Sequence, residues 1–370
     1  MRDTSRRFLR ALLAAGLIVG AVAIPVAAGT ITPATTYVGP GGGSGMCASP
    51  AFSTIQAAVS AAAEGGTILV CPGIYREHVS VTTNGLTIKS VWRWSATLKP
   101  PAVPPIRPAG ESSLITIDGA NDVTIYGLRL AAPTAGDCSQ VAFLILVIDG
   151  ATDAVISNNR LVPTGTDTIG ACGYGTGIEV EGASTARITH NLVKDFQAVG
   201  ISVEGPGSYA FIRRNWVRYF HAAETGTGTG GVGIQVGAAD FAPINPTAQV
   251  RRNMIVGLAT AGVSTPQLDV GISVVQTGPG TVVADNVASH AWVGLDLFLD
   301  TTGARVLRNQ LLDGGYAGIY SDGVVNDFID NIALGNTTYD CYDSGYPSNT
   351  WTGDIGVISQ PAALCSAPRQ

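Results

Sequence analysis

One short pattern constrains the fold of this chain more than any other: an apolar residue followed three positions later by asparagine. Its clearest copy is Ile212-Arg213-Arg214-Asn215. Its asparagines are Asn159, Asn191, Asn215, Asn253, Asn286, Asn309 and Asn331. The shortest separation is 22 residues, from Asn309 to Asn331, and the longest is 38, from Asn215 to Asn253. A period of this size, made of short β-type segments, is what one coil of a β-solenoid requires.

The first 28 residues differ from the rest of the chain. Arg2, Arg6, Arg7 and Arg10 precede an uncharged run from Ala11 to Ala28 that ends in small residues. This pattern predicts a signal peptide at residues 1–28, hence a secreted protein whose leader is removed. The alternative is an uncleaved membrane anchor, because an apolar run of ~18 residues nearly spans a bilayer. After the leader, the sequence predicts no membrane segment.

The net charge of the chain indicates which class of binding partner is disfavoured. The whole chain has 21 Lys and Arg against 27 Asp and Glu, a formal charge of −6. The leader holds four Arg and one Asp, so its removal changes the charge by −3, from −6 to −9. An acidic chain argues against nucleic acid as a partner. The oligomeric state is not indicated by the sequence.

Six cysteines follow the leader, and export predicts three disulfides. Cys138 and Cys172 both lie just before an equivalent strand of consecutive coils. Stacked strands lie ~4.8 Å apart, close to the Cα separation of a disulfide. The predicted pairs are Cys47–Cys71, Cys138–Cys172 and Cys341–Cys365.

The N-terminal part is expected to close one end of the solenoid. Residues 29–46 are rich in Gly, Pro and Thr and predict an irregular arm. Phe52–Gly66 predicts a helix with an apolar stripe, capped by Ser53 or Thr54. Such a helix, placed before the first coil, can cover the open end of the core.

Three segments near the N-terminus resemble a known group of proteins. They are Phe52-Ser53-Thr54-Ile55-Gln56-Ala57-Ala58-Val59, Gly65-Gly66-Thr67-Ile68-Leu69-Val70 and Pro72-Gly73-Ile74-Tyr75-Arg76-Glu77. These segments and the later repeats resemble secreted right-handed parallel β-helix proteins of the pectin-lyase-like superfamily. The resemblance covers roughly Cys47 to Cys365, within a predicted β-helix domain of residues 47–370. It implies an all-β solenoid with an N-terminal capping helix. It does not specify an activity, because that superfamily includes lyases, hydrolases, esterases, epimerases and binding proteins.

The resemblance implies three strands per coil. A Gly-Ile-x-Val strand precedes each asparagine strand, and a third short strand, such as Leu192–Val193, follows it. The first strands are Ile115–Ile117, Leu146–Ile148, Gly177–Val180, Gly200–Val203, Gly233–Val236, Gly271–Val274, Gly294–Leu297 and Gly318–Ser321. The longest loops, Pro163–Tyr174, Tyr219–Gly231 and Gly257–Asp269, are expected to flank the face where superfamily enzymes bind polysaccharide.

The asparagines themselves are predicted to be structural. The tight turn after the second strand needs one residue with left-handed backbone geometry, which asparagine tolerates. Buried asparagine amides can also hydrogen-bond to neighbours in adjacent coils.

Alternation along the first strands predicts two outward columns of side chains. One runs Thr116, Val147, Glu179, Ser202, Gln235, Ser273, Asp296, Tyr320; the other runs Asp118, Asp149, Glu181, Glu204, Gly237, Val275, Phe298, Asp322. The second column begins with four acids in successive coils. Carboxylates ~5 Å apart repel, which raises pKa values or recruits a cation.

Two kinds of site follow from these acids. Asp149, Glu179, Glu181 and Glu204 are predicted as ligands for Ca²⁺, which prefers hard oxygen donors. Glu181, Glu204 and Asp296 are predicted as catalytic carboxylates, since glycoside hydrolysis needs an acid and a base. The alternative is that acids followed by glycine are solvated turn residues.

Basic side chains offer a further candidate surface. Arg187, His190, Arg213, Arg214, Arg251, Arg252, Arg305 and Arg308 lie on or after the second strands. They suit an acidic polysaccharide or form a solvated face paired with nearby Asp. Lys194, Arg218, Tyr219 and His221, near the loops, are predicted to bind substrate. None of them lies in a recognised lyase base motif.

Together these features predict an exported β-helix protein that binds or acts on polysaccharide, as a Ca²⁺-assisted lyase or hydrolase. The alternative is a non-catalytic surface or carbohydrate-binding module. No other cofactor is expected.

Overall fold

The computed structural model describes residues 34–41, 43–101, 113–131, 142–162, 175–196, 198–220, 231–238, 246–257 and 269–368. All of them belong to one compact unit, Pro33–Gln370. The predicted signal peptide, Cys138 and Cys172 therefore lie outside the described residues. Within the described part, no helix is long and apolar enough to cross a membrane.

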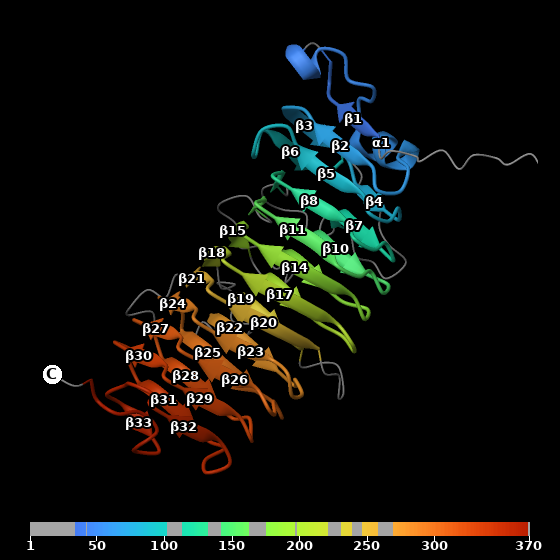
Figure 1. Cartoon of the computed structure of the whole chain (residues 1–370). Helices are drawn as coiled ribbons and strands as arrows, with labels where there is room; N and C mark the ends of the chain where they lie inside the picture. The colour runs from blue at the N-terminus through green and yellow to red at the C-terminus, as the bar shows by residue number, and fades with distance from the viewer. Residues whose placement is uncertain are drawn as a thin grey trace, which may run out of the picture. The chain divides into compact units, whose positions relative to one another are not determined.

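The described chain winds through three sheets in which all named neighbouring strands are parallel (Figure 1). The 12-stranded sheet contains β1 (Thr35–Val38), β2 (Thr67–Val70), β5 (Thr87–Ser90), β8 (Thr124–Tyr126), β11 (Ala154–Ser157), β14 (Thr185–Thr189), β17 (Tyr209–Arg213), β20 (Thr247–Arg251), β23 (Val282–Ala284), β26 (Arg305–Leu307), β29 (Asp327–Ile329) and β32 (Thr350–Thr352).

The 11-stranded sheet contains β4 (Val79–Val81), β7 (Ser113–Asp118), β10 (Phe143–Ile148), β13 (Thr176–Val180), β16 (Val199–Val203), β19 (Val232–Val236), β22 (Val270–Val275), β25 (Val293–Phe298), β28 (Ala317–Ser321), β31 (Tyr339–Asp343) and β33 (Ser359–Gln360). The 10-stranded sheet contains β3 (Gly73–Arg76), β6 (Ala96–Lys99), β9 (Arg129–Ala131), β12 (Arg160–Val162), β15 (Leu192–Phe196), β18 (Trp216–Phe220), β21 (Met254–Val256), β24 (Val287–Ser289), β27 (Gln310–Leu312) and β30 (Ile332–Leu334).

Each full coil contributes one strand to every sheet, and the predicted right-handed parallel β-helix is confirmed. The core lies between the sheets, where equivalent residues of successive coils stack. On the 12-stranded sheet one inward column runs Ile68, Ile88, Ile125, Ile156, Ile188, Ile212, Val250, Val283, Val306 and Phe328, all almost fully buried. The apolar residue three positions before each asparagine is therefore a core residue, as its repetition predicts.

The repeated asparagines form a continuous buried ladder in the turns between the 12-stranded and 10-stranded sheets. From Asn191 to Asn331, Oδ1 of each ladder asparagine accepts hydrogen bonds from the backbone and side-chain amides of the preceding asparagine. Asn253 Oδ1, for example, lies 2.9 Å from Asn215 N and 3.1 Å from Asn215 Nδ2. Asn253 Nδ2 donates to Ile212 O at 3.0 Å. The ladder thus satisfies backbone groups that the turns would otherwise leave unpaired.

The left-handed position of these turns is one residue earlier than predicted. Positive φ angles occur at the residue preceding each ladder asparagine, including His190 (57°), Arg214 (55°) and Arg252 (54°). The asparagine follows the left-handed residue, and its amide is used for bonding between coils.

The Gly-Ile-x-Val glycines allow close contact between successive coils. A Cβ added at Gly200 would lie 2.5 Å from Gly233 O and 2.8 Å from Val217 Cγ1. Atoms this close overlap, so only glycine fits the start of these strands.

The N-terminal end differs from its prediction in two respects. Part of segment 29–46, predicted to be irregular, forms β1, which pairs with β2 and buries Val38. Its Thr-Thr-Tyr-Val sequence favours a strand although glycine and proline surround it. Helix α1 (Ile55–Ala61) is shorter than predicted. The side chain of Thr54 caps it, and Glu77 accepts hydrogen bonds from Ile55 N and Gln56 N, both at 2.8 Å.

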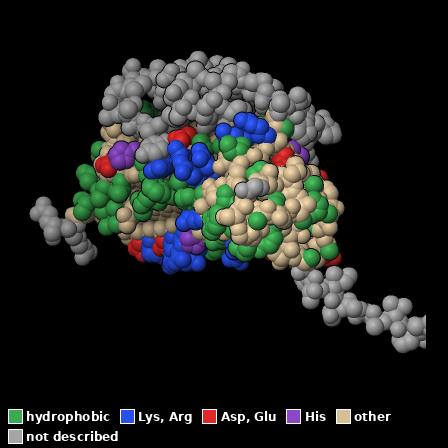
Figure 2. All heavy atoms as spheres, turned by 90° about the horizontal axis from the view of Figure 1, so that it is seen from above, with side chains coloured by type: hydrophobic (Ala, Val, Ile, Leu, Met, Phe, Trp, Pro, Cys, Tyr) green, Lys and Arg blue, Asp and Glu red, His purple; other side chains and the backbone are tan. Residues whose placement is uncertain are grey.

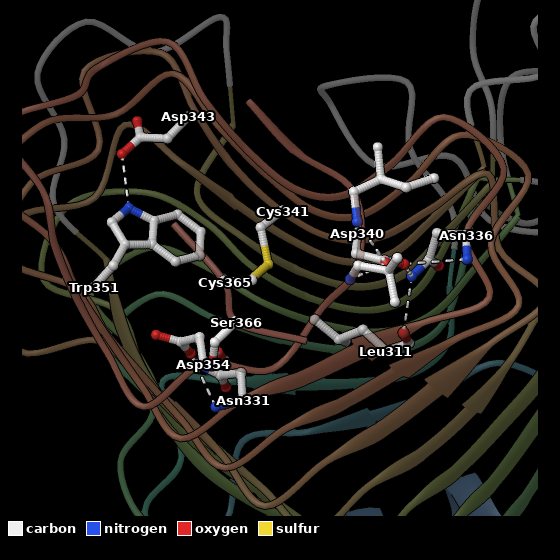
Figure 3. Close-up of a disulfide and its surroundings, with 12 residues drawn as sticks. Leu311, Asn331, Asn336, Asp340, Cys341, Asp343, Trp351, Asp354, Cys365 and Ser366 are labelled. Carbon is white, nitrogen blue, oxygen red and sulfur yellow. Dashed lines mark hydrogen bonds between the residues drawn. A yellow bond between two sulfur atoms is a disulfide. The ribbon is translucent and has the colours of Figure 1, made fainter. Parts of the chain in front are cut away.

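The C-terminal end is closed by side-chain contacts and a disulfide (Figure 3). Trp351 stacks on Phe328 with ring centroids 4.0 Å apart, and its Nε1 donates to Asp343 Oδ2 at 2.8 Å. Cys341 is bonded to Cys365, and at the other end Cys47 is bonded to Cys71. Both pairs are those expected from the sequence.

Candidate functional site

The clearest group of chemically active side chains lies on the outer face of the 11-stranded sheet. Ser273, Asp296, Tyr320 and Tyr342 occupy one register position on β22, β25, β28 and β31. Asp296 lies between Leu295 and Leu297, which are fully buried in the core. Alternation along the strand therefore turns Asp296 away from the core. This site places a carboxyl group between a serine hydroxyl and two tyrosine rings.

Asp296 is a carboxyl group with a buried, unpartnered oxygen and a raised pKa. Its Oδ1 atom is buried and has no hydrogen-bond partner among the described residues. Burial raises its pKa to about 7, because a charged carboxylate is poorly solvated there. A hydrogen bond from Ser273 opposes this rise, and the nearby charge of Asp322 adds to it. Near neutral pH, Asp296 is therefore divided between its protonated and ionised forms.

Asp322 is the second carboxylate of the site and follows β28. Its Oδ1 accepts a hydrogen bond from Leu299 N at 3.0 Å. Burial raises the pKa of Asp322 above its usual value, while this bond lowers it by favouring the ionised form. The site thus contains two electrostatically coupled carboxyl groups in different environments.

Five aromatic rings lie beside these carboxyl groups on three successive coils. Tyr320 and Tyr342 are stacked, with centroids 4.8 Å apart, and Trp292 and Tyr316 are stacked at 5.8 Å. Tyr339 joins the two pairs, 5.7 Å from Tyr316 and 5.0 Å from Tyr342. All five rings are partly exposed, so the cluster presents aromatic surface to a ligand.

The predicted four-acid column is wrong at Asp149. Ile148 pairs with Asp118, and the pairing of Val147 with Val180 makes Ile148 level with Glu181. Asp149 lies one residue beyond the column, in an exposed left-handed turn with φ 56°. Strand β10 reads Phe-Leu-Ile-Leu-Val-Ile, so no alternation of polar and apolar residues marked its register.

The other predicted acids lie on the same outer face as Asp296, nearer the N-terminus. Glu181 and Glu204 follow β13 and β16, which are neighbours in the sheet. Glu204 Oε1 accepts hydrogen bonds from Ser202 Oγ at 2.6 Å and Gln235 Nε2 at 3.1 Å. Glu179, predicted to point outward, does so but is buried, at 7% exposure. Between Glu204 and Asp296 the sheet continues through β19 and β22, so the acids do not form one compact group.

The calcium prediction gains no support from this arrangement. Within the part of the chain that the structure describes, no three His, Cys, Asp or Glu side chains gather where they could hold a metal ion.

Two of the residues predicted to bind substrate, Lys194 and Arg218, lie on the 10-stranded sheet. Lys194 and Arg218 are register partners on β15 and β18 of the 10-stranded sheet. Lys194 forms an ion pair with Asp195, and Arg218 stacks over Trp216 at 4.3 Å. The side chain of Tyr219, all of His221 and most of the three longest predicted loops lie outside the described residues. Of the four residues, only the side chains of Lys194 and Arg218 are described, and they lie on a different sheet from Asp296.

The sequence alone did not predict the aromatic cluster, and it did not single out Asp322 from the other residues of its column. Asp296 and Tyr320 were already neighbours in one predicted outward column, and Asp322 was in the other. The two acids and the tyrosine in neighbouring outward positions were the feature of the sequence that could have indicated this site. Tyr316 and Tyr339 carried no signal, because they lie at or before strand starts, where no repeat pattern fixes their direction.

No known family matches the sequence, and no curated protein matches it. Solved structures do resemble it in fold. A DFA-IIIase from Arthrobacter chlorophenolicus A6, in complex with DFA-III, is 11% identical with a TM-score of 0.53, covering 82% of this chain and 76% of that one.

Two further structures fall below a TM-score of 0.5. The periplasmic alginate epimerase AlgG is 12% identical with a TM-score of 0.49, covering 80% of this chain and 77% of its own. The catalytic unit of a GH87 alpha-1,3-glucanase from Streptomyces thermodiastaticus is 14% identical with a TM-score of 0.48. The match covers 82% of this chain but 66% of the glucanase unit. With the three parallel sheets, the DFA-IIIase likeness shows that this chain has a right-handed parallel β-helix fold.

Proposed function

We propose that this protein acts on carbohydrate and hydrolyses a glycosidic bond at the Asp296 site. The observation that carries the proposal is Asp296 itself, a carboxyl group with one buried, unpartnered oxygen beside a second carboxyl group and a cluster of aromatic rings. Glycoside hydrolysis needs one carboxylic acid that is protonated and one carboxylate that is ionised. Carboxyl groups in different environments supply such a pair.

In this proposal Asp296 donates a proton to the departing glycosidic oxygen. A pKa of about 7 keeps part of the Asp296 population protonated at neutral pH. Asp322 is the proposed ionised partner, which either activates water or attacks the sugar carbon. Burial raises its pKa, and the hydrogen bond from Leu299 N opposes that rise by favouring the charged form. Tyr320 and Tyr342 supply aromatic surface on which the apolar face of a sugar ring can pack.

The structural neighbour supports the chemical class. The DFA-IIIase with which this chain shares its fold is a carbohydrate-active enzyme. Glu204, on the same face, is proposed to contact more distant parts of a polymeric substrate. The proposal contains no calcium step, because no group of three ligands is present among the described side chains.

We also propose that the protein is exported. The leader pattern in residues 1–28 and two disulfides between described cysteines support this location.

The alternative is a carbohydrate-binding module without catalysis, which the exposed aromatic cluster favours. A screen of neutral and acidic polysaccharides with the purified protein separates the two. Hydrolysis releases new reducing ends without unsaturated products, whereas a lyase also produces ultraviolet-absorbing ones. Unsaturated products would contradict the hydrolase proposal. Binding without cleavage of any polymer would replace it with the binding module.

A further inference from the structure

A second charged surface lies on the 12-stranded sheet, away from the strands that carry Asp296. Four arginines of two neighbouring coils form it: Arg213, Arg214, Arg251 and Arg252, hereafter the arginine patch. Arg213 and Arg251 are register partners at the ends of β17 and β20. Arg214 and Arg252 are exposed and occupy the left-handed turn positions that follow. Figure 2 shows Lys and Arg side chains on two sides of the described molecule, with acidic side chains among those at the lower edge.

The fold forces these four positive charges together. Register partners on adjacent parallel strands lie ~4.8 Å apart, and like charges at that distance repel. The pKa of Arg213 is lowered, mainly by Arg214, then by burial, and then by Arg252 and Arg251. Arg251 is held in place by Gln249, whose Oε1 accepts from Nε at 3.0 Å and from a terminal nitrogen at 2.8 Å.

Two other arginines of the same sheet, Arg305 and Arg308, are paired with acids, but the patch is not. Arg308 donates to both carboxylate oxygens of Asp285, at 2.8 and 3.2 Å. Arg305 lies 3.8 Å from Asp327. Among the described residues, no ion pair involves an arginine of the patch. Asp285, in the next coil, is already bound by Arg308.

We propose that the arginine patch binds an anionic polysaccharide, carboxylated or sulfated, at a site separate from the Asp296 face. A polymer with repeated anionic groups neutralises several guanidinium groups at once, and guanidinium forms paired hydrogen bonds with such oxyanions. The formal charge of −6 is opposite to the basic balance of nucleic-acid-binding domains, which favours a polysaccharide. Such a site holds the polymer on the β-helix independently of any reaction.

The test compares a patch variant and a control variant with the unmodified protein. The patch variant combines R213Q, R214N, R251Q and R252N, because asparagine tolerates the left-handed geometry at positions 214 and 252. The control variant combines R305Q and R308N, which removes two arginines of the same sheet that are already paired. Binding of polygalacturonate, dextran sulfate, neutral dextran and a short DNA duplex is measured by calorimetry at low and high salt.

We expect the unmodified protein to bind polygalacturonate or dextran sulfate with an affinity that falls as salt is added. We expect no binding of neutral dextran. The two acidic polymers distinguish carboxylate from sulfate recognition. The patch variant loses at least tenfold in affinity, and the control stays within twofold. Absence of binding to both acidic polymers, equal losses in the two variants, or tighter binding of DNA would overturn the proposal.

A measurement on the unmodified protein tests the proposal even if the patch variant fails to fold. Bound polymer is expected to protect Arg214 and Arg252 from an arginine-specific reagent, mapped by mass spectrometry, but to leave Arg308 unprotected. Equal protection at all three residues would count against the patch. Neither readout depends on bond cleavage, so failure of the hydrolase proposal is distinguishable from failure of this one.

Discussion

The asparagine ladder ends on an acid: Asn331 Nδ2 donates to Asp354 Oδ1 at 2.8 Å, and Asn331 N donates to the same oxygen at 2.9 Å (Figure 3). Asp354 takes the place of the next asparagine, and its other oxygen accepts from Thr352 N at 3.1 Å. Two acceptor oxygens suit this turn, because among the described residues no further ladder asparagine lies beyond Asp354 to accept a hydrogen bond from an amide group. The cost is a buried carboxyl group.

Stability should therefore depend on the titration of Asp354. Burial raises its pKa to about 6, although hydrogen bonds from Asn331 and Thr352 oppose the rise. Because this pKa exceeds the unfolded value of 3.8, the contribution to stability is complete at low pH and is lost as pH rises through 6. Between pH 4 and pH 8 the loss is at most ~3 kcal/mol. Asp354→Asn should remove this part of the pH dependence in urea unfolding; an unchanged pH dependence would contradict the assignment.

Removing one rung should destabilise the whole β-helix. Asn253→Ala leaves two buried donors, the backbone N–H and the side-chain Nδ2–H of Asn215, without their acceptor. Unsatisfied buried groups cost ~1–3 kcal/mol each, so the free energy of unfolding should fall by several kcal/mol. Gln310→Ala, at an exposed strand position, should change it by less than about 0.5 kcal/mol. Similar effects of the two substitutions would show that the ladder is not a main source of stability.

A single added methyl group should be enough to disturb the stacking of coils. In Gly200→Ala the new Cβ overlaps Gly233 O, which is backbone and cannot turn aside. Overpacking of this kind costs ~1–3 kcal/mol, measurable as a lower melting temperature. A melting temperature equal to that of the unmodified protein would mean that coil spacing adjusts freely at this position.

The repeats made most of the fold predictable, because stacking imposes one register on every coil. The apolar residue before each asparagine and the Gly-Ile-x-Val strands recur because every coil must stack in the same register. The positions of side chains were predicted wrongly, or not predicted, where the repeat pattern does not fix the register. Strand β10 is apolar on both faces, which misplaced Asp149 by one residue. The aromatic cluster is assembled from residues as distant as Trp292 and Tyr342, so its geometry depends on the register of three coils at once.

Asp296 should titrate near neutrality in the folded protein. Its pKa of about 7 arises mainly from burial and can be measured by carbon NMR of labelled aspartate side chains, with the resonance assigned by its loss in Asp296→Asn. Asp322→Asn should lower the pKa of Asp296, because it removes a nearby negative charge. A pKa near the ordinary value of 3.8 would exclude Asp296 as a proton donor at neutral pH.

The most direct test of the account is the rate at which reducing ends are released from a polysaccharide panel by the unmodified protein and by Asp296→Asn. We predict that the unmodified protein releases reducing ends from at least one polymer. The rate should fall at least ~100-fold in Asp296→Asn, which is the usual contribution of a general acid. Gln310→Ala, far from the site on the 10-stranded sheet, should leave the rate unchanged. Equal rates for Asp296→Asn and the unmodified protein, or no release from any polymer, would contradict the central claim.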